Sequence, residues 1–233
     1  MEVQIGAAKV AKYATQESGD TLEIIERPHG GLSAVLVDGQ RSGRAAKIVS
    51  NIVARKAISL LGEGVRDGAV ARAAHDYLRT HRGGQVSAEL QMVSVDLRTN
   101  TLVISRNTRC PALVTSDGEL RVLDAPSQPI GIHPTTRPVI VELPLRADIW
   151  VVAYTDGLQL AGSRTGGSVH LQGLLRRAME ERMAASVLAD AILAAALEAE
   201  DHRPCDDISV LVVAVLPTLV PDKVRRYAVS FPA

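Results

Sequence analysis

Three aspartates stand at the ends of the three most apolar segments that we expect to form strands. Asp38 follows the apolar segment 32–37 and precedes Gly39, Asp156 follows 149–154 and precedes Gly157, and Asp206 comes just before 208–216. If the last strand runs antiparallel to the other two, all three carboxylates meet at one edge of the sheet. Carboxylates so close repel each other, and Mg²⁺ or Mn²⁺, which prefer oxygen ligands, would relieve that repulsion.

The glycines that follow two of these aspartates support the same interpretation without deciding it. Glycine after Asp38 and Asp156 allows a sharp turn and lets backbone carbonyls approach an ion. An Asp-Gly pair after a strand is also an ordinary turn, and Asp117-Gly118 is expected to be no more than a hairpin turn. On the pattern alone, a metal site and a set of ordinary turns both stay open.

No group of side chains in the sequence suggests covalent catalysis or a zinc site. The six histidines show no ligand spacing, and no Ser/His or Cys/His arrangement for a nucleophile is evident. Cys110 and Cys205 are too few for a disulfide scaffold and lack the CxxC spacing of a zinc site, so we expect reduced thiols.

The elements that must position the aspartates follow from the apolar periodicity. Strands are expected at 22–26, 32–37, 86–97, 101–106, 112–115, 120–123, 139–143, 149–154 and 208–216, and helices at 43–61, 67–80, 171–183 and 186–200. The segment 162–168 is expected to be a flexible surface loop. Because the helices come in pairs and the strands in hairpin runs, antiparallel sheet covered by helical layers is favoured over a doubly wound parallel sheet.

Composition and charge exclude several classes of partner. The 26 basic residues balance the 26 acidic ones, which argues against a broad surface for nucleic acid or anionic lipid. Six aromatic residues are too few for a base-stacking platform. No apolar run is long enough to span a bilayer, and residues 1–20 lack a signal-peptide core, so we expect a cytoplasmic protein without a membrane or nucleic-acid partner.

Five short motifs occur in an order that is similar to that of a known family. They are Ser18-Gly19-Asp20, Val37-Asp38-Gly39, Pro129-Ile130-Gly131, Tyr154-Thr155-Asp156-Gly157-Leu158 and Asp206-Asp207-Ile208-Ser209. This order resembles the metal-dependent protein phosphatases (PPM, the protein phosphatase 2C-like superfamily), and within them the bacterial branch with the sporulation stage II protein E and stress-response regulator phosphatases. The resemblance covers about 16–216 and implies one phosphatase domain over 1–233, with a short tail at 217–233.

The resemblance implies a fold and a role for each site residue. The fold is an α/β (α+β), four-layer αββα sandwich of two antiparallel sheets flanked by helix pairs, with the metals at one edge. Two divalent cations, Mn or Mg, are implied, with Asp38 bridging both, the Gly39 carbonyl binding one, and Asp156 and Asp206 holding the second. Asp20 would lie in the outer shell, ordering metal-bound water.

Three further positions in and beside these motifs carry separate expectations. Asp207 is expected to order its loop rather than bind metal. Gln40 occupies a position that is histidine in larger members of the family, and it has no titratable proton to give a leaving group. Arg41 stands where glycine is typical, and either contacts the substrate phosphate or points to solvent.

The implied activity is hydrolysis of phosphoserine or phosphothreonine by direct attack of a metal-bridging hydroxide. The implied substrate is a phosphorylated regulatory protein, either an anti-sigma antagonist or a stressosome-type scaffold. The alternative hypothesis is a regulatory binding module of low activity that retains the phosphatase fold. Arg41 and the short sequence, which leaves little room for a lid, favour this alternative.

Overall fold

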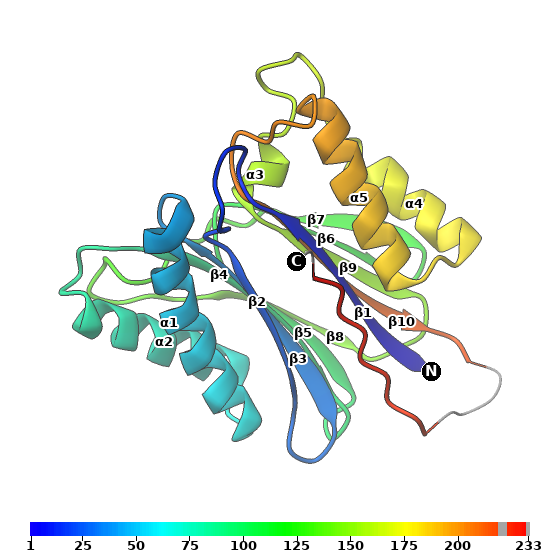
Figure 1. Cartoon of the computed structure of the whole chain (residues 1–233). Coiled ribbons are helices and arrows are strands. Elements are labelled where there is room, and N and C mark those ends of the chain that lie inside the picture. The colour runs from blue at the N-terminus through cyan, green and yellow to red at the C-terminus, as the bar shows by residue number, and fades with distance from the viewer. Residues whose placement is uncertain (219–222, 232–233) are drawn as a thin grey trace.

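Two antiparallel five-stranded sheets lie face to face in a computed structural model that describes residues 1–218 and 223–231 (Figure 1). The first sheet has the order β1 (Glu2–Val10), β10 (Ile208–Leu216), β9 (Ile149–Tyr154), β6 (Ala112–Ser116) and β7 (Glu119–Leu123). The second has the order β2 (Thr21–Glu26), β3 (Gly31–Gly39), β4 (Ala88–Asp96), β5 (Thr101–Asn107) and β8 (Val139–Pro144). All pairings within both sheets are antiparallel.

A pair of helices covers the outer face of each sheet. α1 (Gly43–Gly62) and α2 (Asp67–His81) cover the second sheet, and α4 (Leu171–Glu181) and α5 (Ala185–Ala199) cover the first (Figure 1). A short helix, α3 (Asp156–Gln159), follows β9. The four layers confirm the predicted αββα sandwich.

The apolar patterns form these layers because each element buries the face that its periodicity marks. In α1, the residues that pack on the second sheet recur every three or four positions, from Ala46 through Val49 and Val53 to Leu61. β10 is covered on both faces, by α5 and by the opposite sheet, so its nine residues are almost all apolar. The core therefore has three layers, one between the sheets and one under each helix pair.

The first sheet contains a strand that the sequence analysis did not predict. β1 is the edge strand of that sheet, and it pairs along its whole length with β10. Its residues alternate between two faces, since Val3 and Ile5 pack between the sheets whereas Ala8 and Val10 pack toward α5, but most of them are only partly buried. The pairing with β10, which is distant in sequence, defines this strand.

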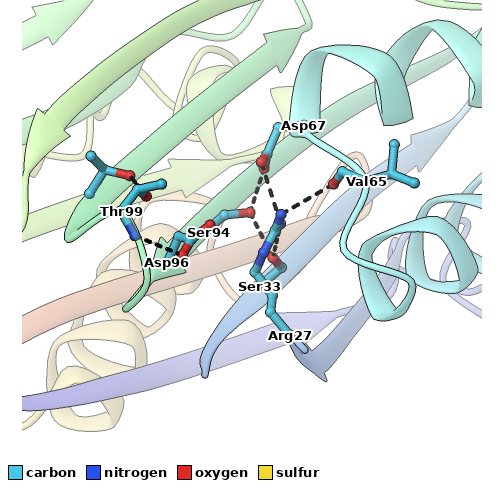
Figure 2. Close-up of polar contacts among 8 residues, drawn as sticks. Arg27, Ser33, Val65, Asp67, Ser94, Asp96 and Thr99 are labelled. Atoms are coloured by element: carbon cyan, nitrogen blue, oxygen red, sulfur yellow. Dashed lines mark hydrogen bonds and ion pairs between the residues drawn. The ribbon is translucent and has the colours of Figure 1, made fainter. Parts of the chain in front are cut away.

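A buried polar network fixes the start of α2 on the second sheet (Figure 2). Asp67 pairs with Arg27 at 3.4 Å and accepts a very short hydrogen bond from the Ser94 hydroxyl. The Arg27 guanidinium also donates to Ser33 Oγ at 3.1 Å and to the Val65 carbonyl at 3.2 Å. Because both charged side chains are almost fully buried, each depends on the other for its counter-charge.

Within the described residues, no helix combines the length and apolar character needed to cross a bilayer. Arg225 and Tyr227 of the C-terminal segment contact the Glu26 carboxylate at the end of β2, with 2.6 Å between the Tyr227 hydroxyl and Glu26 Oε1.

Candidate metal centre

The three predicted aspartates come from both sheets. Asp38 lies at the end of β3, Asp156 is the first residue of α3 after β9, and Asp206 precedes β10. β10 runs antiparallel to β9, so Asp156 and Asp206 lie at the same end of the first sheet. The expectation of one shared sheet edge was wrong for Asp38, because β3 pairs with β2 and β4 in the second sheet. The site therefore forms where the ends of two facing sheets meet.

Asp38 is the electrostatic centre of the group. Burial raises the pKa of its carboxyl to about 10. Repulsion from other carboxylates acts in the same direction, with contributions from Asp20, Asp156, Glu89 and Asp206. Without a cation the Asp38 carboxyl is therefore protonated at neutral pH.

Asp156 lies in direct contact with this centre. Burial raises its pKa first, and repulsion from Asp206 and Glu89 raises it further. The neighbouring Asp38 side chain partly offsets these effects on the pKa of Asp156. A divalent cation would relieve the repulsion among these carboxylates.

Asp20 approaches the same centre from the segment before β2 and is almost completely buried. Its Oδ2 accepts hydrogen bonds from Ser209 at 2.6 Å and from Thr155 at 3.1 Å. Its Oδ1 is buried and has no hydrogen-bond partner among the described residues. Burial raises the pKa of this carboxyl to about 7. An unsatisfied buried acceptor of this kind is a suitable position for a metal-bound water.

Asp207 points away from the group and into the backbone. Its Oδ1 accepts a hydrogen bond from the Lys12 amide and its Oδ2 accepts one from the Gly19 amide, both at 2.9 Å. Asp207 thus ties the residues after β1 and before β2 to the loop that carries Asp206. Its oxygens are used within the protein, which leaves little capacity for an ion.

The glycines beside the aspartates serve close packing. A Cβ on Gly39 would lie 2.1 Å from the Ala46 carbonyl oxygen in α1, and one on Gly157 would lie 2.2 Å from the Asp207 carbonyl oxygen. Neither glycine has a positive φ. A left-handed backbone is therefore not the reason for either glycine. Gly39 lets the end of β3 approach α1, and Gly157 lets the start of α3 approach the loop that carries Asp206.

Gln40 and Arg41 follow Gly39 and are both exposed. The Gln40 side-chain oxygen accepts a hydrogen bond from the Ser87 backbone amide. The backbone amide of Gln40 donates to the Ser87 carbonyl, and both hydrogen bonds are 3.1 Å long. Arg41 is exposed and has a left-handed backbone with φ of 76°. Glycine adopts such a conformation without strain, which accounts for its frequency at this position in the related phosphatases.

Glu89 is a member of the group that the sequence analysis missed. It lies in β4 directly opposite Asp38 of β3, so the two side chains project from the same face of the sheet. The Glu89 carboxylate accepts a very short hydrogen bond from the Thr108 hydroxyl and one of 3.3 Å from the Arg109 amide. The only signal in the sequence was an acidic residue within an apolar strand, and its meaning depended on the register with β3.

The donor set suits hydrated Mg²⁺ or Mn²⁺ better than a fully protein-ligated ion. Among the described residues, no three Asp, Glu, His or Cys side chains are close enough to hold one ion by themselves. Mg²⁺ typically keeps several waters and uses one or two carboxylates. Crowded carboxylates, the Gly39 backbone and the unsatisfied Asp20 Oδ1 match that requirement.

A comparison with protein families decides the affiliation of the chain. Residues 28–216 match the family model described as stage II sporulation protein E (SpoIIE). The chain belongs to the SpoIIE family. The matched range contains Asp38, Asp156 and Asp206, whereas Asp20 lies before it. No protein in the set of curated sequences matches the chain.

Solved structures share the fold at low sequence identity. The PP2C phosphatase domain of SpoIIE from Bacillus subtilis, solved with a fragment of its regulatory domain, has a TM-score of 0.77 and 20% identity. That match covers 92% of this chain and 63% of the other, so the present chain spans less than two thirds of that protein's solved length.

Two further structures extend the comparison. A chain from the bacterial stressosome, a modular system adapted to control secondary messenger signalling, has a TM-score of 0.70 and 17% identity, covering 91% of this chain and 100% of the other. The catalytic domain of the serine/threonine protein phosphatase PstP, in complex with two manganese ions, has a TM-score of 0.68 and 16% identity, covering 92% and 99%. The SpoIIE-family chain therefore has the PP2C phosphatase fold.

Proposed function

We propose that this SpoIIE-family chain is a metal-dependent phosphatase that hydrolyses phosphoserine or phosphothreonine in a regulatory protein. The observation that carries the proposal is the convergence of carboxylates from both sheets on Asp38, whose pKa is raised to about 10. Such a cluster is costly to fold unless cations neutralise it. Proteins generally retain a cost of this kind only where the site has a function.

The proposed ion ligands are Asp38, the Gly39 carbonyl, Asp156 and Asp206, with Asp20 and Glu89 around them. When bound, two divalent cations supply Lewis acidity toward a phosphoryl oxygen and lower the pKa of water. Asp38 would be the central ligand of these ions, because the other carboxylates of the group surround it closely enough to raise its pKa.

The surrounding residues hold these carboxylates in place. Thr155 and Ser209 orient Asp20 through its Oδ2 and leave Oδ1 free to accept a proton from a water. Asp207 fixes the loop before β10, so Asp206 is presented at the end of β9. The protein's contribution is therefore the fixed position of the negative charges that would hold the ions, and the ions would in turn attract the phosphoryl group.

The cysteines do not offer a competing covalent mechanism. Burial raises the pKa of the Cys110 thiol far above its usual range, and burial also raises the pKa of Cys205. A thiol with a raised pKa is a poor nucleophile at neutral pH. Direct attack by water is the mechanism that the remaining groups support.

A regulatory role follows from the family and fold relatives rather than from a residue of this chain. One relative was solved with part of its regulatory domain and another belongs to the stressosome. We propose a phosphorylated anti-sigma antagonist or stressosome-type scaffold in the cytoplasm as the substrate, recognised by one phosphatase domain that spans the chain.

The test is hydrolysis of p-nitrophenyl phosphate by metal-stripped protein, with and without added Mn²⁺ or Mg²⁺. Asp38→Asn and Asp156→Asn are compared with Asp190→Asn, which changes an exposed residue of α5. We expect activity that requires the metal, is lost in the first two variants and is retained in the third. Mn²⁺ binding measured by calorimetry gives a second readout that does not depend on turnover.

The low-activity binding module is the alternative outcome. Arg41 favours it, because it stands in the loop after Gly39 at a position where the resemblance implies glycine, and it is exposed. Folded protein that binds Mn²⁺ but fails to hydrolyse either the small ester or a phosphoserine peptide would support the module and contradict the phosphatase. Hydrolysis that persists in Asp38→Asn would contradict the proposed metal centre.

A further inference from the structure

A cavity of about 880 Å³ lies beside the loop that carries Asp206. Three segments form it, namely the residues after β1, the turn after α3 and the connection between α5 and β10, and they meet at the end of the sandwich where α3 lies (Figure 1). Its wall includes Cys205, the immediate neighbour of Asp206, and Lys12, whose amide is bonded to Asp207. The cavity and the candidate metal centre therefore share one loop.

The charge of the cavity is opposite to that of the metal centre. Lys12, Arg164 and Arg203 line it together with the carboxylates of Glu200 and Asp201. The basic side chains outnumber the acidic ones only slightly. What the cavity can bind therefore depends on which of these charges are already neutralised by ion pairs within the protein.

Glu200 is fully used inside the protein. Its side chain is 1% exposed, and it accepts hydrogen bonds from the amides of Gly162 at 2.7 Å and Cys205 at 2.9 Å. It also pairs with Arg164 at 3.1 Å. Glu200 thus connects the end of α5 to the turn after α3 and to the loop before β10. Its charge is compensated by Arg164 and by the two amide dipoles.

Two cations stay available. Within the described residues, the Lys12 ammonium has no hydrogen-bond or ion-pair partner, and the Arg203 guanidinium only stacks over the Tyr13 ring at 5.5 Å. Stacking holds a guanidinium in place and leaves its N–H groups free to bind a carboxylate. Lys12 and Arg203 line the same cavity, Arg203 is held over the Tyr13 ring, and neither has a counter-charge of its own among the described residues apart from the exposed Asp201.

We propose that this cavity binds an acidic side chain of the phosphoprotein substrate, close in sequence to the phosphorylated residue. The inference rests on the proposed phosphatase function. An extended peptide advances about 3.3–3.6 Å per residue, so a phosphoserine at the metal centre brings residues a few positions away over the adjoining loop. Lys12 and Arg203 attract a carboxylate there, whereas the metal centre attracts the phosphoryl group. The site thereby selects phosphoserines with acidic neighbours.

The test compares two phosphoserine peptides that differ only in their neighbours, one with Asp and Glu and the other with Asn and Gln. Lys12→Glu, Arg203→Glu and the double variant are compared with Arg176→Glu, which reverses an exposed charge on α4. Arg164 is kept, because removing it would leave the buried Glu200 without its cation.

We expect the wild type and Arg176→Glu to prefer the acidic peptide by about fivefold in kcat/KM, and the double variant to lose that preference. Activity on p-nitrophenyl phosphate, which is too small to reach the cavity, should stay within about twofold in all variants. A preference that is absent in the wild type, or equal losses on both peptides in the double variant, would overturn the inference.

A binding experiment separates this inference from the proposed function. The fluorescence anisotropy of a labelled acidic peptide without phosphoserine is measured with metal-free protein, at low and high salt. We expect binding that weakens with salt and with the double variant, since the contacts are between exposed charges. Such binding without any hydrolysis would contradict the proposed phosphatase function but support the proposed binding of acidic side chains in the cavity. Hydrolysis together with equal peptide binding by the wild type and the double variant would contradict only the proposed binding of acidic side chains. Absence of hydrolysis and of peptide binding would overturn both proposals.

Discussion

Gln91 of β4 donates a hydrogen bond of 2.6 Å to the backbone carbonyl of Tyr154 in β9, and so joins the two sheets directly beneath the candidate metal centre. Both residues are buried. Glu89 lies two residues before Gln91, and Asp156 two residues after Tyr154. The bond therefore sets the separation between two strands that carry carboxylates of the site from opposite sheets.

We expect Gln91→Met to lower the free energy of unfolding by about 2 kcal/mol, because the Tyr154 carbonyl loses its buried donor while the side-chain volume is nearly conserved. Urea denaturation measures the change, with Gln172→Met on the exposed face of α4 as the matched control. Equal stability of the Gln91→Met variant and the wild type would show that the inter-sheet bond contributes nothing.

Glu89→Gln should weaken Mn²⁺ binding by about tenfold, as expected when a residue that supports metal ligands is changed. Glutamine keeps one oxygen for the Arg109 amide, and its NH2 group can donate to the Thr108 hydroxyl, but it removes one negative charge opposite Asp38. Titration calorimetry with Mn²⁺ measures the affinity, and Glu180→Gln on the exposed surface of α4 is the control. Unchanged affinity would place Glu89 outside the metal site.

Arg27→Met should cost about 3–5 kcal/mol of stability at neutral pH, because it leaves the buried Asp67 without its cation. Burial already raises the pKa of Asp67, and loss of Arg27 raises it further. For an acid whose pKa is raised in the folded state, the favourable contribution is complete at low pH and is lost as the pH rises through the folded pKa. The deficit should therefore shrink as the pH falls toward 4.

Denaturation of wild type and Arg27→Met at pH 4 and pH 7 checks this prediction. Arg177→Met, which breaks an exposed pair with Glu181 in α4, is the control and should leave stability almost unchanged, because water screens such a pair. A deficit that is the same at both pH values would contradict the role assigned to the charge of Asp67.

His75 should make the protein less stable in mild acid. It is buried in α2, its Nδ1 accepts a hydrogen bond of 3.1 Å from the Gly131 amide, and burial lowers its pKa. A lowered folded pKa means that stability is complete above the ordinary pKa of about 6.5 and is lost as the pH falls through the folded pKa.

His75→Asn keeps an acceptor near the Gly131 amide but cannot be protonated. Between pH 7 and pH 5 the wild type should lose more stability than this variant, by up to about 1.4 kcal/mol per pH unit. Thermal denaturation across this range measures the difference, with His202→Asn at an exposed position as the control. Parallel pH profiles of the wild type and His75→Asn would refute the prediction.

The residue patterns by themselves predicted antiparallel sheet covered by helix pairs and singled out three of the carboxylates, whereas the αββα order of the layers came from the resemblance to the phosphatases. The apolar runs that end in β3 and β9 and that form β10 are long and strongly patterned, so burial alone defines them. The Asp residues at their ends were visible because a charge beside such a run cannot enter the core. The hairpin turn at Asp117-Gly118, between β6 and β7, was predicted for a local reason and confirmed.

Tertiary structure decided what depends on partners distant in the sequence. β1 is a strand because β10 pairs with it, and Glu89 joins the carboxylates because β4 lies in register with β3. Asp38 and Asp156 come from different sheets and are brought together where the sheets face each other. Lys12 and Arg203, which are far apart in the sequence, line the same cavity. Periodicity records only which face of an element is buried, whereas strand order and register fix which side chains meet and how strongly their charges interact.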